Sequence, residues 1–169
     1  MKQSPSSAKL LSTLRIAPVA PGDLPVVLGL VRKLAEYEHL AHMMVATEED
    51  FRQALFGPHA SVEAVLAWWE DIPVGFALFF PSFSTFLGRS GLYLEDLFVE
   101  PEYRGRGIGK AILQHLARIA RERKYGRMEW SVLDWNQPAI GFYQKLGAQL
   151  MDEWTTCRLT GAALEALAE

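Results

Sequence analysis

The spacing of apolar residues predicts a regular succession of helices and strands. Apolar positions three or four residues apart predict helices over about residues 24–38, 47–55, 107–124, 139–146 and 162–167. Runs rich in apolar and aromatic residues predict strands over about residues 10–17, 62–69, 74–80, 91–99, 127–133 and 149–159. Residues 81–90, rich in Ser, Phe and Gly, are expected to form a loop. This order is typical of an α/β fold with a mixed sheet.

Polar residues and prolines support several of these boundaries. Asp23 is the predicted N-cap of the first helix. Thr47 and Asp50 form a near capping box for the second helix, with Asp where Glu or Gln is usual. Residues 70–73 predict the turn of a hairpin between two strands.

Composition and charge narrow the class of protein. The chain has 169 residues, and we expect a single domain over residues 10–169 after a flexible tail of residues 1–9. The net charge of −3 gives no global basic field, so nucleic acid is not expected as a partner. No apolar stretch approaches the roughly 20 residues that span a membrane, and the single cysteine, Cys157, cannot form an intrachain disulfide. We therefore expect a cytoplasmic protein with no membrane partner. Without Cys and His at metal-site spacing, we also expect no metal.

One stretch combines a strand, a glycine-rich turn and the start of a helix. Residues 92–99 form an apolar strand that carries Glu95 and Asp96, and residues 104–110 follow as RGRGIGK. The backbone N–H groups of such a turn and the positive end of the helix dipole favour an anion. The turn lacks the Gly-Lys-Ser/Thr ending of a Walker A loop and the glycine spacing of a dinucleotide fold. A plain strand-to-helix connection is the alternative.

The same stretch and four others carry a resemblance to a known family. The motifs are Leu-Ala-x-Tyr-Glu, Leu-Tyr-Leu-Glu-Asp-Leu-Phe-Val, Pro-Glu-Tyr-Arg-Gly-x-Gly-Ile-Gly, Trp-Asn-x-Pro and Phe-Tyr-x-x-x-Gly-Ala, in this order. The sequence is similar in them to the GNAT N-acetyltransferases. Within that superfamily it resembles the diamine (spermidine/spermine and thialysine) branch, over about residues 12–150.

The resemblance implies a GNAT fold, in which a mixed central β-sheet is flanked by helices and a splayed central strand pair binds the co-substrate acetyl-CoA. The strand backbone would bond the pantetheine, and the N–H of Leu97 would polarise the thioester carbonyl. The turn would bind the pyrophosphate, and Asn136 would contact the cofactor, cap its helix, or both. The implied cofactor-binding residues are Leu97, Phe98, Val99, Arg104, Gly105, Arg106, Gly107, Ile108, Gly109, Lys110, Asn136 and Tyr143.

The resemblance also implies catalytic roles. Acetyl transfer to an amine needs a base for the ammonium proton and an acid for the departing thiolate. Tyr143 matches the family tyrosine that protonates the coenzyme A thiolate; the residues alone favour a packed aromatic beside Phe142, and with the resemblance the acid role leads. Glu95 is the candidate base, acting through water. Because strand residues alternate, Asp96 is expected on the opposite face as a structural carboxylate that accepts hydrogen bonds.

The acceptor side of the site is marked by fewer residues. Tyr37 and Glu38 match the acceptor-side pair of the diamine branch and, with Glu95, are the expected substrate-binding residues. Before the central strand the branch carries an Asp and a Trp, whereas this chain has FSTFLG over residues 83–88. Fewer acidic groups predict an amine that is smaller and less charged than spermine.

These inferences together predict an enzyme, an acetyl-CoA-dependent N-acetyltransferase that acts on a primary amine of a small molecule. Direct attack by the amine is expected, because no Cys or Ser nucleophile motif is present. The alternatives are a protein lysine or N-terminal acetyltransferase, and a non-catalytic acyl-CoA sensor. A sensor needs neither Glu95 nor Tyr143, so both residues argue against it. A homodimer is implied by the resemblance only.

Overall fold

The predicted strands assemble into one mixed sheet. The computed structural model describes residues 13–169, and its five strands lie in the order β1-β2-β3-β4-β5. All neighbouring strands are antiparallel except β4 and β5, which are parallel. The strands are β1 (Leu14–Pro18), β2 (Glu63–Trp69), β3 (Ile72–Ser84), β4 (Arg89–Val99) and β5 (Met128–Trp130). The mixed α/β architecture expected from the sequence is confirmed.

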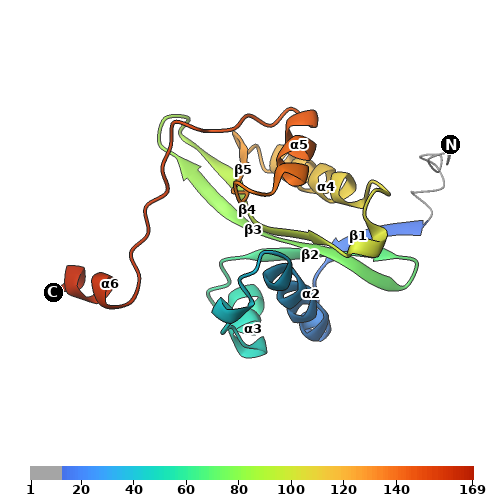
Figure 1. Cartoon of the computed structure of the whole chain (residues 1–169), viewed down its shortest axis with the longest axis horizontal. Helices are drawn as coiled ribbons and strands as arrows, with labels where there is room; N and C mark the ends of the chain where they lie inside the picture. The colour runs from blue at the N-terminus through green and yellow to red at the C-terminus, as the bar shows by residue number, and fades with distance from the viewer. Residues whose placement is uncertain (1–12) are drawn as a thin grey trace. The chain divides into compact units, whose positions relative to one another are not determined.

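Five α-helices and three 3₁₀ helices connect and follow these strands in the described chain (Figure 1). They are η1 (Pro21–Asp23), α2 (Leu24–Tyr37), η2 (Ala41–Met43), α3 (Glu48–Phe56), η3 (Pro101–Tyr103), α4 (Ile108–Glu122), α5 (Gln137–Lys145) and α6 (Gly161–Ala168). The chain divides into two compact units, one that ends at Ser131 and one from Val132 to Glu169. Within the described residues, no helix is long and apolar enough to cross a membrane.

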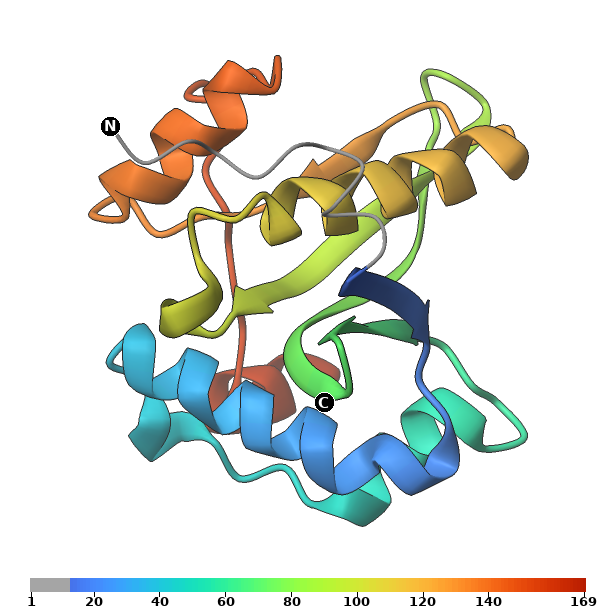
Figure 2. The ribbon, with the colours of Figure 1, turned by 90° about the vertical axis from the view of Figure 1, so that its right-hand side faces the viewer.

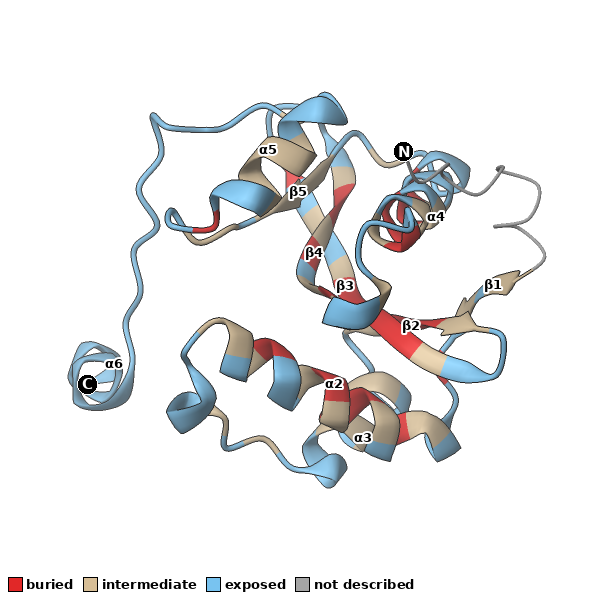
Figure 3. Ribbon diagram, turned by 45° about the vertical axis from the view of Figure 1, so that its right-hand side comes forward, coloured by how far each residue is buried: buried red, intermediate tan, exposed pale blue. Residues whose placement is uncertain are grey.

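Helices cover both faces of the sheet in the unit that ends at Ser131. Figures 1 and 2 show α2 and α3 on one face and α4 on the other. Buried residues, red in Figure 3, lie along the strands and on the sides of α2 and α4 that face them. The sheet is therefore the middle layer, and β3 and β4 are buried from both sides.

The apolar periodicity explains which side chains form the two layers of the core. On one face Phe76, Leu78 and Phe98 of the sheet pack with Leu30 and Leu34 of α2. Their neighbours along the strands point to the other face, because strand residues alternate. There α4 contributes an apolar stripe of residues three or four apart, namely Ile108, Ile112, Leu116 and Ala120.

Local capping agrees with the sequence at one helix and differs at another. The capping box of α3 is complete: the N–H of Asp50 donates to Thr47 Oγ1 (3.3 Å), and the N–H of Thr47 donates to Asp50 Oδ2 (2.8 Å). Asp23 is the N-cap of α2 by position, but its side chain makes no capping hydrogen bond. Its carboxylate instead accepts from the N–H of Ala20 (2.9 Å), within η1.

Two predictions about strands are wrong. Residues 81–90 are not a loop, because β3 continues to Ser84 and β4 begins at Arg89, and the two form one long hairpin. Pairing with a neighbouring strand outweighs the weak strand preference of Ser, Pro and Gly. Residues 149–159 do not form a strand but an irregular, exposed segment before α6. The predicted tail of residues 1–9 and the start of the first predicted strand lie outside the described residues.

A β-bulge interrupts the pairing of β3 with β4. Leu78 pairs with Asp96 and Phe79 pairs with Leu94, so Glu95 is an extra residue on β4 without a partner in the register. Leu94 and Asp96 consequently lie on opposite faces of the sheet, although they are two residues apart. Leu94 shares the face of Phe79, toward α4, and Asp96 shares the face of Leu78, toward α2.

Candidate functional site

One edge of β4 loses its partner strand midway. The parallel pairing with β5 ends where Leu94 meets Trp130, whereas the antiparallel pairing with β3 continues until Val99 meets Gly75. Beyond Leu94, no strand of residues 13–169 pairs with the side of β4 that faces away from β3. We name this side, over residues 95–99, the open edge of β4. The splayed strand pair implied by the resemblance is present.

Hydrogen-bond alternation shows which backbone groups reach the open edge. The N–H of Glu100 donates to the carbonyl of Val74 (2.8 Å), the residue opposite it in the β3 register. Bonded and non-bonded pairs alternate along an antiparallel ladder, so Phe98 also bonds toward β3. Leu97 and Val99 then direct their N–H and C=O groups to the open edge. The predicted role of the Leu97 N–H, as a hydrogen-bond donor to the thioester carbonyl, is compatible with this geometry.

The glycine turn has the backbone geometry of an anion site. Gly105 and Gly107 have φ values of 75° and 84°, in the left-handed region that glycine adopts at little cost. Gly107 is the N-cap of α4 and supplies no side-chain cap, so the first N–H groups of the helix lack intrahelical partners. Left-handed residues within such a turn direct successive N–H groups into a concave surface that favours anions.

The two arginines of the turn rest on aromatic rings. The guanidinium of Arg104 lies 4.6 Å from the ring centroid of Tyr37 and 5.4 Å from that of Phe98. Arg106 lies 5.4 Å from the ring of Trp69 and 5.1 Å from the ring of Tyr103. The backbone of the turn is thus in the predicted place, while both guanidinium groups already have partners within the protein.

Three carboxylates gather where β4 passes the end of α2. Burial, with the charges of Glu95 and Glu38, raises the pKa of Asp96 to about 6. Burial also raises the pKa of Glu38. The Lys and Arg ion pairs within residues 13–169 involve other carboxylates. A group of acids without such a partner favours a bound cation, because a nearby positive charge relieves their repulsion. We name Glu38, Glu95 and Asp96 the acid cluster.

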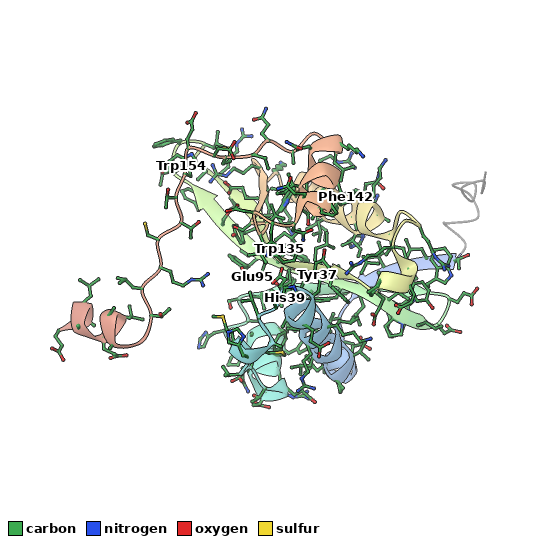
Figure 4. The ribbon with its side chains drawn as sticks, in the orientation of Figure 1. Tyr37, His39, Glu95, Trp135, Phe142 and Trp154 are labelled. Atoms are coloured by element: carbon green, nitrogen blue, oxygen red, sulfur yellow. The ribbon has the colours of Figure 1, made fainter. Side chains whose placement is uncertain are left out.

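The end of α2 supplies the aromatic neighbour of this cluster. Figure 4 shows Tyr37, His39 and Glu95 in one region of the view, where α2 ends below the sheet. Tyr37 packs on the apolar core, and its ring carries the guanidinium of Arg104. His39 follows the C-cap Glu38 with φ 61°, an unfavourable left-handed conformation for a residue with a Cβ. The helix therefore ends abruptly beside the acid cluster.

Asp96 does not make the contacts that its expected structural role requires. The expectation that Glu95 and Asp96 face opposite sides rests on strict alternation, which the bulge at Glu95 breaks. The expected structural role is not supported either, since the Asp96 carboxylate has no hydrogen bond or ion pair within residues 13–169. The nearness of Asp96 to both Glu38 and Glu95 becomes evident only in the folded structure.

The unit from Val132 to Glu169 carries the remaining predicted site residues. Asn136 caps α5, since its Oδ1 accepts a hydrogen bond from the N–H of Ala139 (3.3 Å). That capping role is confirmed, and a contact with the cofactor stays a prediction. Tyr143 lies on α5 with its ring 5.3 Å from the ring of Phe142. Its role as an acid also stays a prediction. No group of three or more His, Cys, Asp or Glu within residues 13–169 is arranged to hold a metal ion.

Comparisons with known proteins agree with the geometry of the turn and the strand. Residues 30–148 match the model of the acetyltransferase (GNAT) family. The L-ornithine N5-acetyltransferase of Arabidopsis thaliana is 34% identical, over 97% of this chain and 91% of that protein. The thialysine N-epsilon-acetyltransferase of Bos taurus is 38% identical, over 87% and 92%. Among solved structures, an integron cassette protein of V. cholerae superposes with a TM-score of 0.78 at 30% identity, over 93% of this chain and 98% of that one.

Proposed function

The chain belongs to the acetyltransferase (GNAT) family, and we propose that it transfers the acetyl group of acetyl-CoA to a primary amine of a small molecule. Strand β4 carries this proposal. Its open edge offers backbone groups to the pantetheine, and the glycine turn that follows offers N–H groups to the pyrophosphate. Its face toward α2 bears the acid cluster, which favours a cationic amine. One strand therefore provides groups for both substrates.

The reaction requires the amine to lose a proton before it attacks. In the proposed sequence the ammonium gives a proton through water to Glu95, the nitrogen forms a bond to the acetyl carbon, and the carbon–sulfur bond breaks. The N–H of Leu97 donates to the carbonyl oxygen as negative charge develops there. The attacking nitrogen loses its second proton to solvent, and Tyr143 gives its proton to the departing thiolate and recovers one from solvent. No acetyl-enzyme forms on this path.

We propose that the acceptor is a small amine with a second polar or charged group. The acid cluster supports a cation, and Asp96 and Glu38 are the members that burial makes most dependent on a positive partner. Relatives named for thialysine and ornithine act on small molecules of this kind. The hairpin between β3 and β4 carries exposed Phe83, Phe86 and Leu87 instead of acids. This agrees with an acceptor less charged than spermine.

A panel of amines tests the function. Thialysine, ornithine, short diamines, spermidine, spermine, lysine and a lysine peptide are each supplied with acetyl-CoA, and thiol release is measured. We expect thialysine, ornithine or a short diamine to react fastest. Tyr143→Phe should bind coenzyme A normally and lose at least about 100-fold in kcat. A peptide preferred over every free amine, or no thiol release with any amine, contradicts the proposal.

We also propose that the protein is a cytoplasmic homodimer. The exposed segment over residues 149–159 has the composition of a strand, and Leu150, Met151 and Trp154 are accessible on it. An extended apolar segment of this kind pairs readily with the sheet of a second copy. Light scattering should give twice the mass of the chain, and removal of residues 149–169 should yield a monomer. The exposed thiol of Cys157 is compatible with a reducing compartment.

A further inference from the structure

Arg104 joins the two halves of the site through three contacts of one side chain. Its Nε donates a hydrogen bond to the carbonyl of Val99 (2.8 Å), on the open edge of β4. Its guanidinium lies over the ring of Tyr37, at the end of α2, and beside the ring of Phe98. The glycine turn, the open edge and the acceptor end of α2 are thereby held together by a single planar cation.

These contacts have a specific geometric demand. A guanidinium can stack its flat face on an aromatic ring while its edge donates hydrogen bonds, whereas the compact ammonium of lysine cannot do both. The carbonyl of Val99 faces the open edge and accepts from Arg104. With Nε bonded to Val99 and the guanidinium carbon 4.6 Å from the ring centroid of Tyr37, the Arg104 side chain is held against β4 and the end of α2.

We propose that the Arg104 side chain is a positioning residue for the amine acceptor and not a ligand of the cofactor phosphates. Through Tyr37 it fixes the end of α2 beside Glu38, and through Val99 it fixes the end of β4. The position of Glu38 relative to Glu95, Asp96 and the open edge then depends on this contact. The inference rests on the proposed function, because it assigns the acceptor to the acid cluster. The backbone of the turn keeps its expected role toward the pyrophosphate.

The chain offers a set of variants that isolate the contact. Arg104→Lys keeps the positive charge and removes the stacked plane. Tyr37→Leu removes the ring that carries it, and Tyr37→Phe keeps that ring. Arg15→Lys is the matched control, since Arg15 lies 4.8 Å from the ring of Trp68 on a part of the sheet that we assign no role in the site. Coenzyme A affinity is measured by calorimetry, and kcat and KM are measured with the best amine of the panel.

A selective defect on the amine is the expected result. Arg104→Lys should raise the KM of the amine by about fivefold to tenfold, while the Kd of coenzyme A changes by less than about twofold. Tyr37→Leu should show the same defect with Arg104 intact, and Tyr37→Phe should show a smaller defect than Tyr37→Leu, because it keeps the ring. The double variant Arg104→Lys/Tyr37→Leu should be no worse than Tyr37→Leu, because both changes remove one interaction. Arg15→Lys should match wild type.

Two results would overturn the inference. A Kd for coenzyme A that rises as much as the KM of the amine would make Arg104 a phosphate ligand. Effects of Arg104→Lys and Tyr37→Leu that multiply would show that the two residues act independently. If Arg104→Lys unfolds, as thermal melting would show, the Tyr37 pair alone decides between the outcomes. Wild-type activity on the panel separates these failures from a failure of the proposed function itself.

Discussion

The open edge of β4 and its face toward α2 offer different kinds of chemical groups. We call the open edge with the glycine turn the main-chain side of β4, and the face toward α2 its side-chain side. The open edge and the glycine turn use main-chain groups, whose direction is set by strand pairing and by left-handed glycines. The face toward α2 uses side chains, and its acids come from the C-cap of α2, from the bulge residue Glu95 and from Asp96 after it. Main-chain groups suit a co-substrate that a whole family shares. Side chains can change one at a time, so they suit an acceptor that differs between relatives.

The largest expected effect comes from removing the base. Glu95→Gln should lower kcat by about 100-fold or more, because the ammonium then lacks a proton acceptor. The Kd of coenzyme A should remain within about twofold of wild type, since the main-chain side is intact. Rates measured across pH should also lose their acidic limb. A pH–rate profile with the wild-type shape would show that another group takes the proton.

The next effect concerns Asp96 and depends on pH. The folded-state pKa of Asp96 is raised from 3.8 to about 6, so the folded protein loses stability relative to the unfolded chain as pH rises from about 4 through 6. Asp96→Asn removes this loss and should stabilise the protein at pH 8 by up to about 3 kcal/mol, and by little at pH 4. Urea unfolding at both pH values measures the difference.

The same variant should weaken the amine site. Asp96→Asn is expected to raise the KM of a cationic acceptor while it raises stability, a combination typical of a functional acid. Asp71→Asn, at an exposed residue of the β2–β3 turn, is the matched control and should change neither quantity. If Asp96→Asn proves destabilising at pH 8, the carboxylate is held by a favourable partner and not strained by its neighbours.

A smaller effect is expected from the main-chain side. Gly107→Ala places a Cβ at φ 84°, which costs about 1–2 kcal/mol and displaces the first N–H groups of α4. The Kd of coenzyme A should rise about tenfold while the preference among amines is kept. Gly22→Ala is the control, because a Cβ there has nothing within 4 Å. An altered order of amines with Gly107→Ala would mean that the two sides of β4 are not separable.

The smallest expected effect is that of a substitution at the N-cap of α3, which belongs to neither the main-chain side nor the side-chain side of β4. Thr47→Val removes the hydroxyl that caps α3 and should lower the free energy of unfolding by about 1 kcal/mol. Neither the Kd of coenzyme A nor the KM of the amine should change. Thermal melting with both kinetic constants checks this. A kinetic change would extend the acceptor side beyond the end of α2.

The sequence predicts the main-chain side better than the side-chain side. The strand, the glycines of the turn and the amphipathic pattern of the helix each show within a short stretch of sequence. The position of the turn and the start of α4 can therefore be predicted from local sequence alone. The bulge at Glu95 depends on the register with β3, which no local pattern reveals. Strict alternation is therefore not a sound basis for relating the faces of Glu95 and Asp96. The long β3–β4 hairpin is missed for the same cause, because pairing decides it and local preference does not.

The bulge has a consequence for how β4 tolerates change. It shifts the alternation of side chains along the strand. Residues before the bulge and residues after it both alternate between the two faces of the sheet, but two residues that flank the bulge an even number of positions apart lie on opposite faces. Deleting Glu95 would remove the extra residue and let β4 pair with β3 without a bulge. Leu94 would still face α4, and Asp96 and Phe98 would still face α2. A one-residue deletion at this position is therefore expected to keep both layers of the core, whereas a deletion elsewhere within β4 would turn the residues on one side of it to the opposite face.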